Sequence, residues 1–394
     1  MTTQASALPD AVLDQVAERI GAGTTIAGLG ESTRFAHETF AVREQLFRRL
    51  VRRHGFRALA VQDDARVAAA LDKFVTGGAE NGAAGPPAAE TSAAGTAAAA
   101  LDGAWRPWRT AEMAEALDWI RAFNHDHPDH PVRILGVKPA QARPADYDAV
   151  LEHVRVTAPG RLAALAAHLD PIRTAHQIDE HVQRARGIHP GGSFAEHARA
   201  ALAIVEHLPD QGVLPLMRRI AGFHERSVAG RNDYAGDART WAATIVGHQR
   251  RTGARIAYWD GIAHTAATPV TLGLAPERGA QPTVGAVLRE QYGAGYVAVA
   301  IGFHHGDLGI ADVPAPAQDW LDARLGTAGQ PALWLDLRTP EACRRWNAPA
   351  TVRVISGIYD PARDAAEHLT VDNLPAAVDV LVHLREVSPV RRLP

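Results

Sequence analysis

The residues from 24 to 62 contain the pattern that most restricts the fold. Residues 24–31, TTIAGLGE, are an apolar run ended by a glycine turn, which predicts a short buried strand. Residues 37–56 repeat apolar side chains at helical spacing up to Gly55, which predicts an amphipathic helix. Residues 57–62, RALAVQ, predict a second buried strand. This order of elements is a βαβ unit, which requires a parallel sheet with a right-handed crossover.

Further apolar segments predict that this unit belongs to a larger sheet. They lie at 132–137, 254–264, 296–303, 332–337, 352–357 and 378–384. Helical spacing predicts additional helices over 10–20 and over 108–128, the latter with Thr110 as its N-cap. We therefore expect an α/β fold with a mainly parallel central sheet that is flanked by helices.

The pattern between residues 144 and 250 is helical throughout. We expect this range to form an α-helical lobe inserted in the α/β core, which then comprises 1–143 and 251–394. Lobe and core are expected to form a cleft over the C-terminal strand ends, where such sheets bind ligands. Residues 77–101 hold no large apolar residue before Leu101, which predicts a low-complexity flexible loop.

Composition and charge exclude several classes of function. A formal net charge of −3 over 394 residues gives no electrostatic basis for binding nucleic acid or an anionic membrane. The single cysteine, Cys343, excludes an intramolecular disulfide framework and a cysteine-based metal centre, and it favours a reducing, cytoplasmic setting. No apolar run approaches the roughly 18 residues of a membrane span, and the N-terminus does not resemble a signal peptide.

The motif content restricts the chemistry further. The sequence has no HExxH or comparable spaced motif, so we expect neither a metal nor a cofactor. The pattern GxSxG is also absent, which argues against Ser32 as the nucleophile of a triad. The abundance of Ala, Arg, Gly and Pro is typical of a GC-rich bacterial genome. We expect a cytoplasmic protein that acts on a small-molecule substrate, as a monomer or a homodimer.

Polar side chains follow several of the predicted strands at the points where these strands end. In a parallel sheet such ends meet at one edge, so the side chains are expected to lie together. The candidates are Glu31, Arg34 and His37; Gln62, Asp63 and Asp64; Lys138 and Gln141; Asp260 and His264; and His304, His305 and Asp307.

The charged candidates also have a purely structural interpretation. Glu31 and Glu38 flank a helix start, where carboxylates interact favourably with the helix dipole. Arg43 lies inside that helix, where it could simply be solvated. Asp63 and Asp64 could be a solvated strand exit.

The histidines differ in their sequence context. His264 follows a strongly apolar strand and the tight Gly261 turn, which favours a role in the site over a surface role. His304 and His305 are neighbours in an extended segment, so at most one of them points into the cleft. His37, taken alone, is typical of an ordinary surface histidine.

At these residues the sequence resembles the erythromycin esterase family, which also includes proteins labelled as succinoglycan-biosynthesis-like. The resemblance covers nearly the whole chain and rests on GESTRFAHETFAVRE, HGFRALAVQDD and IAYWDGIAH, in that order. Glu31 and Arg43 fall on the family's glutamate and arginine, and His264 falls on a histidine of its paired-histidine strand end. The resemblance implies hydrolysis of an ester or a lactone by an activated water molecule.

The sequence departs from the family's pattern at four positions. Arg34 stands where the family has the loop histidine that is thought to activate water, and Gln62 stands where it has a glutamate. Gly261 replaces the first histidine of the pair, and Lys138 replaces an aspartate after the third strand. Arg34 cannot accept a proton at neutral pH, so the esterase mechanism does not carry over intact.

We assign Glu31, His264, Arg43 and His37 as the candidate catalytic residues. Glu31 or His264 would act as acid or base, and His37 could substitute spatially for the missing histidine. Arg43 and Arg34 together would form a positive pocket suited to a carboxylate, a phosphate or an enolate. The candidate substrate-binding residues are Arg34, Gln62, Asp63, Lys138, Asp260 and His304.

Three functions are compatible with these assignments. The first is hydrolysis of an ester or lactone bond in a small, natural-product-type substrate such as an antibiotic. The second is a biosynthetic tailoring reaction of secondary metabolism, catalysed as a lyase, dehydratase, cyclase or acyl-transfer enzyme. This second function needs only one base and cationic stabilisation of an anion. The third is non-catalytic binding of a small ligand in the same cleft.

Overall fold

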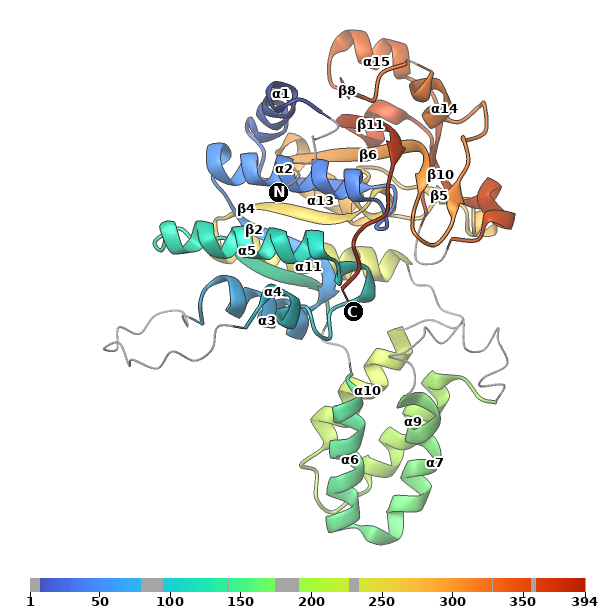
Figure 1. Cartoon of the computed structure of the whole chain (residues 1–394). Helices are drawn as coiled ribbons and strands as arrows, with labels where there is room; N and C mark the ends of the chain where they lie inside the picture. Colours follow the sequence, from blue (N-terminus) through green and yellow to red (C-terminus); the bar gives the residue numbers. More distant parts are fainter. Residues whose placement is uncertain are drawn as a thin grey trace. The chain divides into compact units, whose positions relative to one another are not determined.

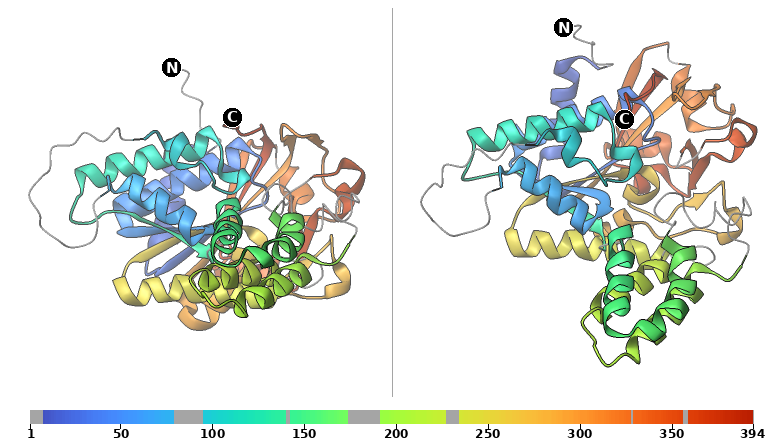
Figure 2. Two further views of the ribbon diagram at one scale, coloured as in Figure 1. Left: turned by 90° about the horizontal axis from the view of Figure 1, so that it is seen from below. Right: turned by 60° about the horizontal axis from the view of Figure 1, so that its bottom comes forward.

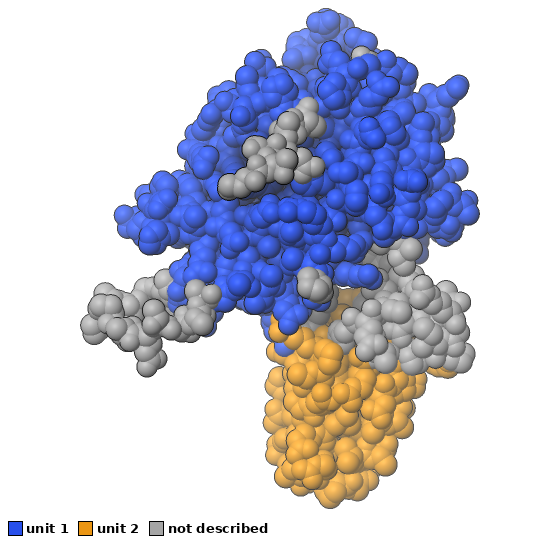
Figure 3. All heavy atoms as spheres, viewed as in Figure 1, with its two compact units in different colours: residues 1–138, 234–394 blue, residues 139–233 orange. Residues whose placement is uncertain are grey.

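The computed structural model describes residues 8–78, 95–139, 142–173, 191–226, 234–327, 329–355 and 359–393. The chain divides into two units (Figure 3): residues 1–138 with 234–394 form the first unit, and residues 139–233 form the second. The predicted site residue Gln141 and most of the predicted loop at 77–101 lie outside the described residues.

The first unit is built on a sheet whose strands follow the order β3-β2-β4-β1-β6-β11-β8, with β7 paired to β6. Within the described part of this sheet, only β7 and β8 pair with their neighbours in an antiparallel direction. This confirms the expected α/β fold with a mainly parallel central sheet. The strands are β1 (Ile26–Glu31), β2 (Phe56–Asp64), β3 (Arg133–Lys138), β4 (Arg255–Gly261), β6 (Tyr296–Asp307), β7 (Asp312–Val313), β8 (Ala332–Asp336) and β11 (Val380–Val387).

Helices cover both faces of this sheet, as Figures 1 and 2 show. Side chains alternate between the faces along each strand. Leu29 and Trp259 belong to the core under α2 and α5, whereas Tyr258 belongs to the core under α11 and α13. The helices of this unit are α1 (Asp10–Gly21), α2 (His37–His54), α3 (Ala65–Val75), α4 (Ala97–Ala100), α5 (Ala111–Asp126), α11 (Tyr234–Thr252), α12 (Ile262–Thr265), α13 (Val284–Tyr292), α14 (Leu321–Gly326), α15 (Pro340–Trp346) and α16 (Leu374–Ala377).

Local sequence signals explain where two of these helices begin and end. Gly55 ends α2 in the left-handed conformation, with φ of 66°, which glycine adopts without steric cost. Thr110 caps α5, because its Oγ1 accepts a hydrogen bond of 3.1 Å from the backbone N–H of Met113. The predicted N-cap at Thr110 is therefore confirmed.

The glycines in the GLGE end of β1 allow close approach of neighbouring groups. A Cβ atom at Gly28 would lie 2.2 Å from the hydroxyl of Tyr296, and one at Gly30 would lie 2.0 Å from Oγ1 of Thr265. Both distances are far below van der Waals contact. The glycines therefore let α12 and β6 pack directly onto the backbone of β1.

Two predicted strands differ from the expectation: one is shorter, and the other belongs to a separate sheet. The strand predicted over 254–264 stops at Gly261, because α12 begins at Ile262. The segment predicted over 352–357 forms β9 (Ala350–Arg353), which is not part of the central sheet. It pairs in a separate three-stranded sheet with β10 (His368–Val371), which in turn pairs with β5 (Thr271–Leu272).

In the described part of the second unit, four α-helices pack around a separate core. Tyr147, Leu165, Phe194 and Met217 are among its fully buried side chains. The helices are α6 (Pro144–Thr157), α7 (Leu162–Ile172), α9 (Phe194–Glu206) and α10 (Leu214–Arg226). Short 3-10 turns complete the two units: η1 (Arg106–Trp108), η2 (Pro159–Arg161), η4 (Pro276–Arg278), η5 (Gly293–Gly295) and η6 (Pro361–Ala366).

The second unit ends at residue 233, whereas the sequence pattern placed the end of the helical lobe at residue 250. The difference is α11, which belongs to the first unit. Trp241 and Ile245 of α11 are buried in one cluster with Tyr258 of β4. This contact with the sheet, which helical periodicity alone does not reveal, determines the unit to which α11 belongs.

None of the helices in the described ranges has both the length and the apolar character that crossing a membrane requires.

Asn124 joins α5 to the end of α3 and to the residue before β3 through one buried amide. Its Nδ2 donates to the carbonyl oxygens of Val75 (3.0 Å) and Val132 (2.9 Å), and its Oδ1 accepts from the N–H of Val132 at 2.6 Å.

Asn124→Ala would leave these buried groups unpaired, so we expect a loss of about 2–4 kcal/mol in the free energy of unfolding. Urea unfolding measures this loss, with the exposed neighbour His125→Ala as control. Equal stability of the two variants would contradict the prediction.

Candidate active site

The parallel register brings the polar strand ends of β1, β2, β3 and β4 to one edge of the sheet. Glu31 at the end of β1 is level with Gly261 at the end of β4. Asp64 at the end of β2 is level with Lys138 at the end of β3. The parallel direction of the strands alone is enough to bring the residues that follow them to the same edge of the sheet.

Glu31 and Arg43 form a fully buried ion pair in which Nη1 of Arg43 lies 2.7 Å from Oε1 of Glu31. The Arg43 guanidinium carbon also lies 4.6 Å from the ring centroid of Trp259, 5.1 Å from that of Phe40 and 5.2 Å from that of Trp108. Burial raises the pKa of Glu31, and Arg43 opposes that rise. Arg43 is therefore not a solvated surface charge but the counter-ion of the glutamate.

Arg34 is held in a fixed position by two acceptors from neighbouring strands. Its Nη2 donates hydrogen bonds to Oε1 of Gln62 and to Oδ1 of Asp260. Asp260 is fully buried and also accepts from the hydroxyl of Tyr258 and, at 2.7 Å, from the N–H of Gly261. Arg34 Nε is buried and has no hydrogen-bond partner in the described ranges. The guanidinium thus combines a fixed orientation with one unused donor.

Gly261 lies directly beside this guanidinium. A Cβ atom at Gly261 would lie 3.5 Å from Nη1 of Arg34 and 3.6 Å from the carbonyl oxygen of Glu31. Both distances are those of ordinary van der Waals contact, so Arg34 packs against the end of β4.

His264 lies on α12, immediately after β4, and its ring centroid is 5.0 Å from that of Trp241. Burial lowers the pKa of His264. Arg34 and Lys138 lower it further, whereas Asp260 raises it. The imidazole is thus kept neutral near pH 7, which is the state that can accept a proton.

Lys138 and Asp63 are connected through Trp105. The ammonium group of Lys138 lies 4.8 Å from the ring centroid of Trp105 and 5.4 Å from that of Trp241. Asp63 accepts a 2.8 Å hydrogen bond from the N–H of Trp105, and burial raises the pKa of its carboxyl group. The Arg34 guanidinium carbon is also 4.8 Å from the Trp105 ring. Trp105 therefore contacts both cations of the site.

Asp64 has a structural role, because its side chain caps the start of a helix. Its carboxylate accepts hydrogen bonds from the N–H groups of Arg66 (2.6 Å) and Val67 (3.0 Å), so it is the N-cap of α3. The helix α3 begins directly at this position, and no solvated strand exit is present here.

His37 on α2 is paired with a carboxylate of α5. Its Nδ1 lies 2.9 Å from Oε1 of Glu112 on α5, and this contact raises the pKa of His37. Glu112 also accepts a hydrogen bond of 3.1 Å from the N–H of Arg391. The proposed substitution of His37 for the missing histidine therefore has no support in this geometry, since the ring is engaged in a pair between α2 and α5.

The C-terminal segment 388–391, which includes Arg391, also binds the loop between β1 and α2. The N–H of His37 donates to the carbonyl oxygen of Ser388 at 2.8 Å, and the N–H of Val390 donates to that of Phe35 at 3.0 Å. Glu38 accepts 2.6 Å hydrogen bonds from both the N–H and the hydroxyl of Ser388. Glu38 thus fixes this segment at the start of α2.

His304 belongs to a different group of side chains. Its Nδ1 lies 2.9 Å from Nδ1 of His305, and the charged groups that influence its pKa are His305, His383, Arg353 and Asp322. Burial is the main cause that lowers the pKa of His304. The side chain that His304 contacts through a ring nitrogen is therefore His305. Asp307 instead accepts a 2.7 Å hydrogen bond from the N–H of Gly309 in the following loop.

Three contributors to the site were not identified from the sequence: Trp105, Trp241 and Tyr258. Tyr258 could have been found, because it precedes Asp260 by two residues and must share its face of β4. Trp241 was missed because α11 was assigned to the helical lobe. No local signal marks Trp105, which follows the low-complexity segment.

The described ranges contain no group of three or more His, Cys, Asp or Glu side chains arranged to hold a metal ion.

Arg43→Met would leave the carboxylate of Glu31 buried without a counter-charge. We expect the free energy of unfolding to fall by about 3–5 kcal/mol, measured by urea unfolding at pH 7. The double variant Glu31→Gln with Arg43→Met removes both charges and should recover much of this loss. A loss below about 1 kcal/mol for the single variant would contradict the buried pair.

Lys138→Met would remove one of the cations that disfavour the charged form of His264. We therefore expect the pKa of His264 to rise toward the ordinary value of 6.5. An NMR titration of the imidazole signals measures this pKa, with the signal assigned by His264→Gln. Lys73→Met, at an exposed position on α3, should leave it unchanged. A pKa that falls, or does not move, in Lys138→Met rules out this electrostatic account.

A family model described as erythromycin esterase matches residues 51–387. The match includes His264, Lys138 and Asp260 but begins after Glu31 and Arg34. No curated protein matches the chain significantly.

Solved structures similar to this chain share its fold along nearly the whole length. A Bacillus cereus protein is 18% identical with a TM-score of 0.64, and the alignment covers 99% of this chain and 96% of the other. A succinoglycan biosynthesis protein is 17% identical with a TM-score of 0.63, covering 99% and 95%. A mutant of the erythromycin esterase EreC in its open conformation is 16% identical with a TM-score of 0.58, covering 95% and 93%.

Proposed function

The chain belongs to the erythromycin esterase family, and from this premise we propose that it hydrolyses an ester or lactone bond in a small, natural-product-type substrate. The family and the structural similarity to EreC support an esterase-like function. The observation that carries the proposal is the position of His264 on α12, the helix that directly follows β4 and its residue Asp260, the partner of Arg34; burial and the cations Arg34 and Lys138 lower the pKa of its imidazole. A base beside fixed cations is what attack of water on a carbonyl group requires.

In this mechanism His264 accepts a proton from a water molecule as the water oxygen bonds to the carbonyl carbon of the substrate. The carbonyl oxygen becomes an oxyanion, which the positive charge of the Arg34 guanidinium, held in place by Gln62 and Asp260, stabilises. The C–O bond to the leaving alcohol then breaks, and the proton on His264 passes to the alkoxide oxygen. One water is consumed, and a carboxylic acid and an alcohol are formed.

The other candidate bases are less suited to this step. Glu31 is fully buried and paired with Arg43 at 2.7 Å. His37 is engaged with Glu112. His264, by contrast, lies on α12 and keeps part of its surface exposed. We therefore assign the base to His264, with Glu31 and Arg43 as the pair that holds the start of the loop.

Arg34 also supports a second candidate function, an elimination or cyclisation. A guanidinium that is fixed by Asp260 and Gln62 would stabilise an enolate as well as a tetrahedral oxyanion. His264 would then remove a proton from carbon instead of from water. The two reactions differ in whether an oxygen atom from solvent enters the product.

Turnover of a panel of esters and lactones in ¹⁸O-labelled water tests the proposal. We expect the acid product to carry one solvent oxygen, and His264→Ala to lower kcat/KM by roughly 10²–10⁴. The rate should fall as the pH drops through the lowered pKa of His264, below 6.5, because the protonated imidazole cannot accept a proton. His130→Ala, at an exposed position, is the matched control. A product without solvent oxygen would favour elimination or cyclisation, and full activity of His264→Ala would refute the assigned base.

A further inference from the structure

The segment 388–393, which we call the strap, connects two separate parts of the candidate active site. Figure 1 shows it in dark red, running from the end of β11 past the start of α2 toward the start of α5. On one side, the hydrogen bonds of Ser388 and Val390 bind the strap to His37 and Phe35, at the end of the loop between β1 and α2.

On its other side the strap binds the chain between η1 and α5. The N–H of Ala111 donates to the carbonyl oxygen of Arg391 at 2.7 Å, and the N–H of Leu393 donates to that of Arg109 at 3.0 Å. The N–H of Arg391 also donates to the carboxylate of Glu112 at 3.1 Å. The strap therefore joins the first turn of α5 to the loop that precedes α2.

Each of these two parts carries a side chain of the candidate site. The loop before α2 carries Arg34, and the chain before α5 carries Trp105, whose ring centroid lies 4.8 Å from the Arg34 guanidinium carbon. Gln62 contacts both parts, because its side chain accepts from Arg34 and its carbonyl oxygen accepts from Nε1 of Trp108 at 3.2 Å. A shift of either part would therefore change how Arg34 is held.

His37 and Glu112 connect the same two parts directly. Nδ1 of His37, the first residue of α2, lies 2.9 Å from Oε1 of Glu112 in the first turn of α5. The side chain of Glu112 is only 4% exposed, so the contact is shielded from water. A protonated imidazole donates a charge-assisted hydrogen bond to a carboxylate, and such a bond is stronger than one from a neutral imidazole. The connection is therefore strongest while His37 is charged.

We propose that His37 and Glu112 are positioning residues that, together with the strap, hold Arg34 and Trp105 in place for the proposed reaction. The pair acts through the backbone of the two parts that it connects and not by contact with the substrate. This role rests on the proposed hydrolysis, which it extends by a dependence on the charge of His37.

The charged neighbours of His37 set the direction of this dependence. The hydrogen bond to Glu112 raises the pKa of His37 above 6.5, and Glu38 on α2 raises it further, whereas burial and Arg391 of the strap lower it. The imidazole is thus charged below this raised pKa, and it loses the charge as the pH rises through it. Further charged side chains of the same elements close to this point are Glu115, which binds Arg391, and Arg392, which lies over Phe35.

The pH dependence of kcat/KM tests the proposal, because the two histidines act on opposite limbs. The rate should fall below 6.5 as His264 is protonated. It should also fall roughly five- to tenfold above 6.5, as His37 loses its proton and the hydrogen bond becomes a neutral one. Glu112→Gln removes the carboxylate and lowers the pKa of His37, so the alkaline limb should move to lower pH while the acid limb stays. Glu115→Gln is the matched control, because Glu115 is a carboxylate of the same helix that binds Arg391.

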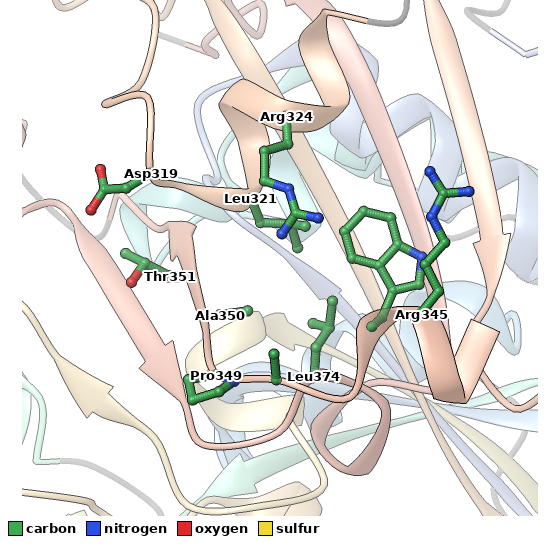
Figure 4. A pocket seen from close by; sticks show the side chains of 10 residues that line it. Asp319, Leu321, Arg324, Arg345, Pro349, Ala350, Thr351 and Leu374 are labelled. Carbon is green, nitrogen blue, oxygen red and sulfur yellow. The ribbon is translucent and has the colours of Figure 1, made fainter. Parts of the chain in front are cut away.

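His37→Gln separates positioning from catalysis by His37 itself. Glutamine keeps a donor for Glu112 but has no charge to lose, so the alkaline limb should disappear while the acid limb remains. A loss of roughly 10²-fold or more at every pH would identify His37 as a catalytic base and overturn the proposal. Arg324→Gln should leave both limbs unchanged, because it removes a charge from the hollow between α14, α15 and the start of β9 (Figure 4), on elements outside the strap and the two parts that it joins.

Hydrogen exchange measured by mass spectrometry tests the positioning without any turnover. Protection of residues 33–38 and 105–113, corrected for the intrinsic effect of pH, should fall roughly five- to tenfold as the pH rises through the pKa of His37. In Glu112→Gln this fall should come at lower pH. If the protection changes in this way but no ester or lactone is cleaved, the hydrolysis is refuted and the positioning of Arg34 and Trp105 stands.

Three results would overturn the positioning role. They are an active protein without an alkaline limb, an alkaline limb that does not move in Glu112→Gln, and equal protection of both parts in Glu112→Gln and Glu115→Gln. Circular dichroism confirms that each variant is folded.

Discussion

The ion pair between Glu31 and Arg43 is the interaction on which the geometry of the site depends. Removing two charges from water costs several kcal/mol for each ion, and the pair is tolerated only with close contact and compensating neighbours. Here the neighbours are the aromatic rings of Trp259, Phe40 and Trp108, which surround the guanidinium. The end of β1 is thereby tied to α2, so the loop between them has little freedom.

Arg34, Gln62 and Asp260 act as one set. Arg34 requires an anionic partner, which Asp260 supplies, and a neutral acceptor, which Gln62 supplies. A glutamate in place of Gln62 would put a second carboxylate beside the same guanidinium nitrogen. The result is a cation in a fixed position that cannot accept a proton at neutral pH.

Periodicity and glycine turns were sufficient to predict the βαβ unit and the mainly parallel sheet, because these signals are local. They also located Glu31, Arg34, Asp260 and Gln62 at one edge, since parallel strands deliver their ends to the same side. The partner of His37 could not be predicted, because Glu112 is 75 positions away and nothing local links the two. The position of α11 could not be predicted either, because its helical pattern is equally compatible with packing in the first unit or in the second.

The hydrogen bonds from Ser388 and Val390 to the start of α2 have a consequence for the order of assembly. The backbone groups of Ser388 and Val390 that bind His37 and Phe35 come directly after β11, the last strand of the central sheet in sequence order. During translation these hydrogen bonds can form only after every described strand of that sheet has been made, whereas Glu31 and Arg43 lie close together in sequence and can pair much earlier. The loop that carries Arg34 is therefore secured in two separate stages.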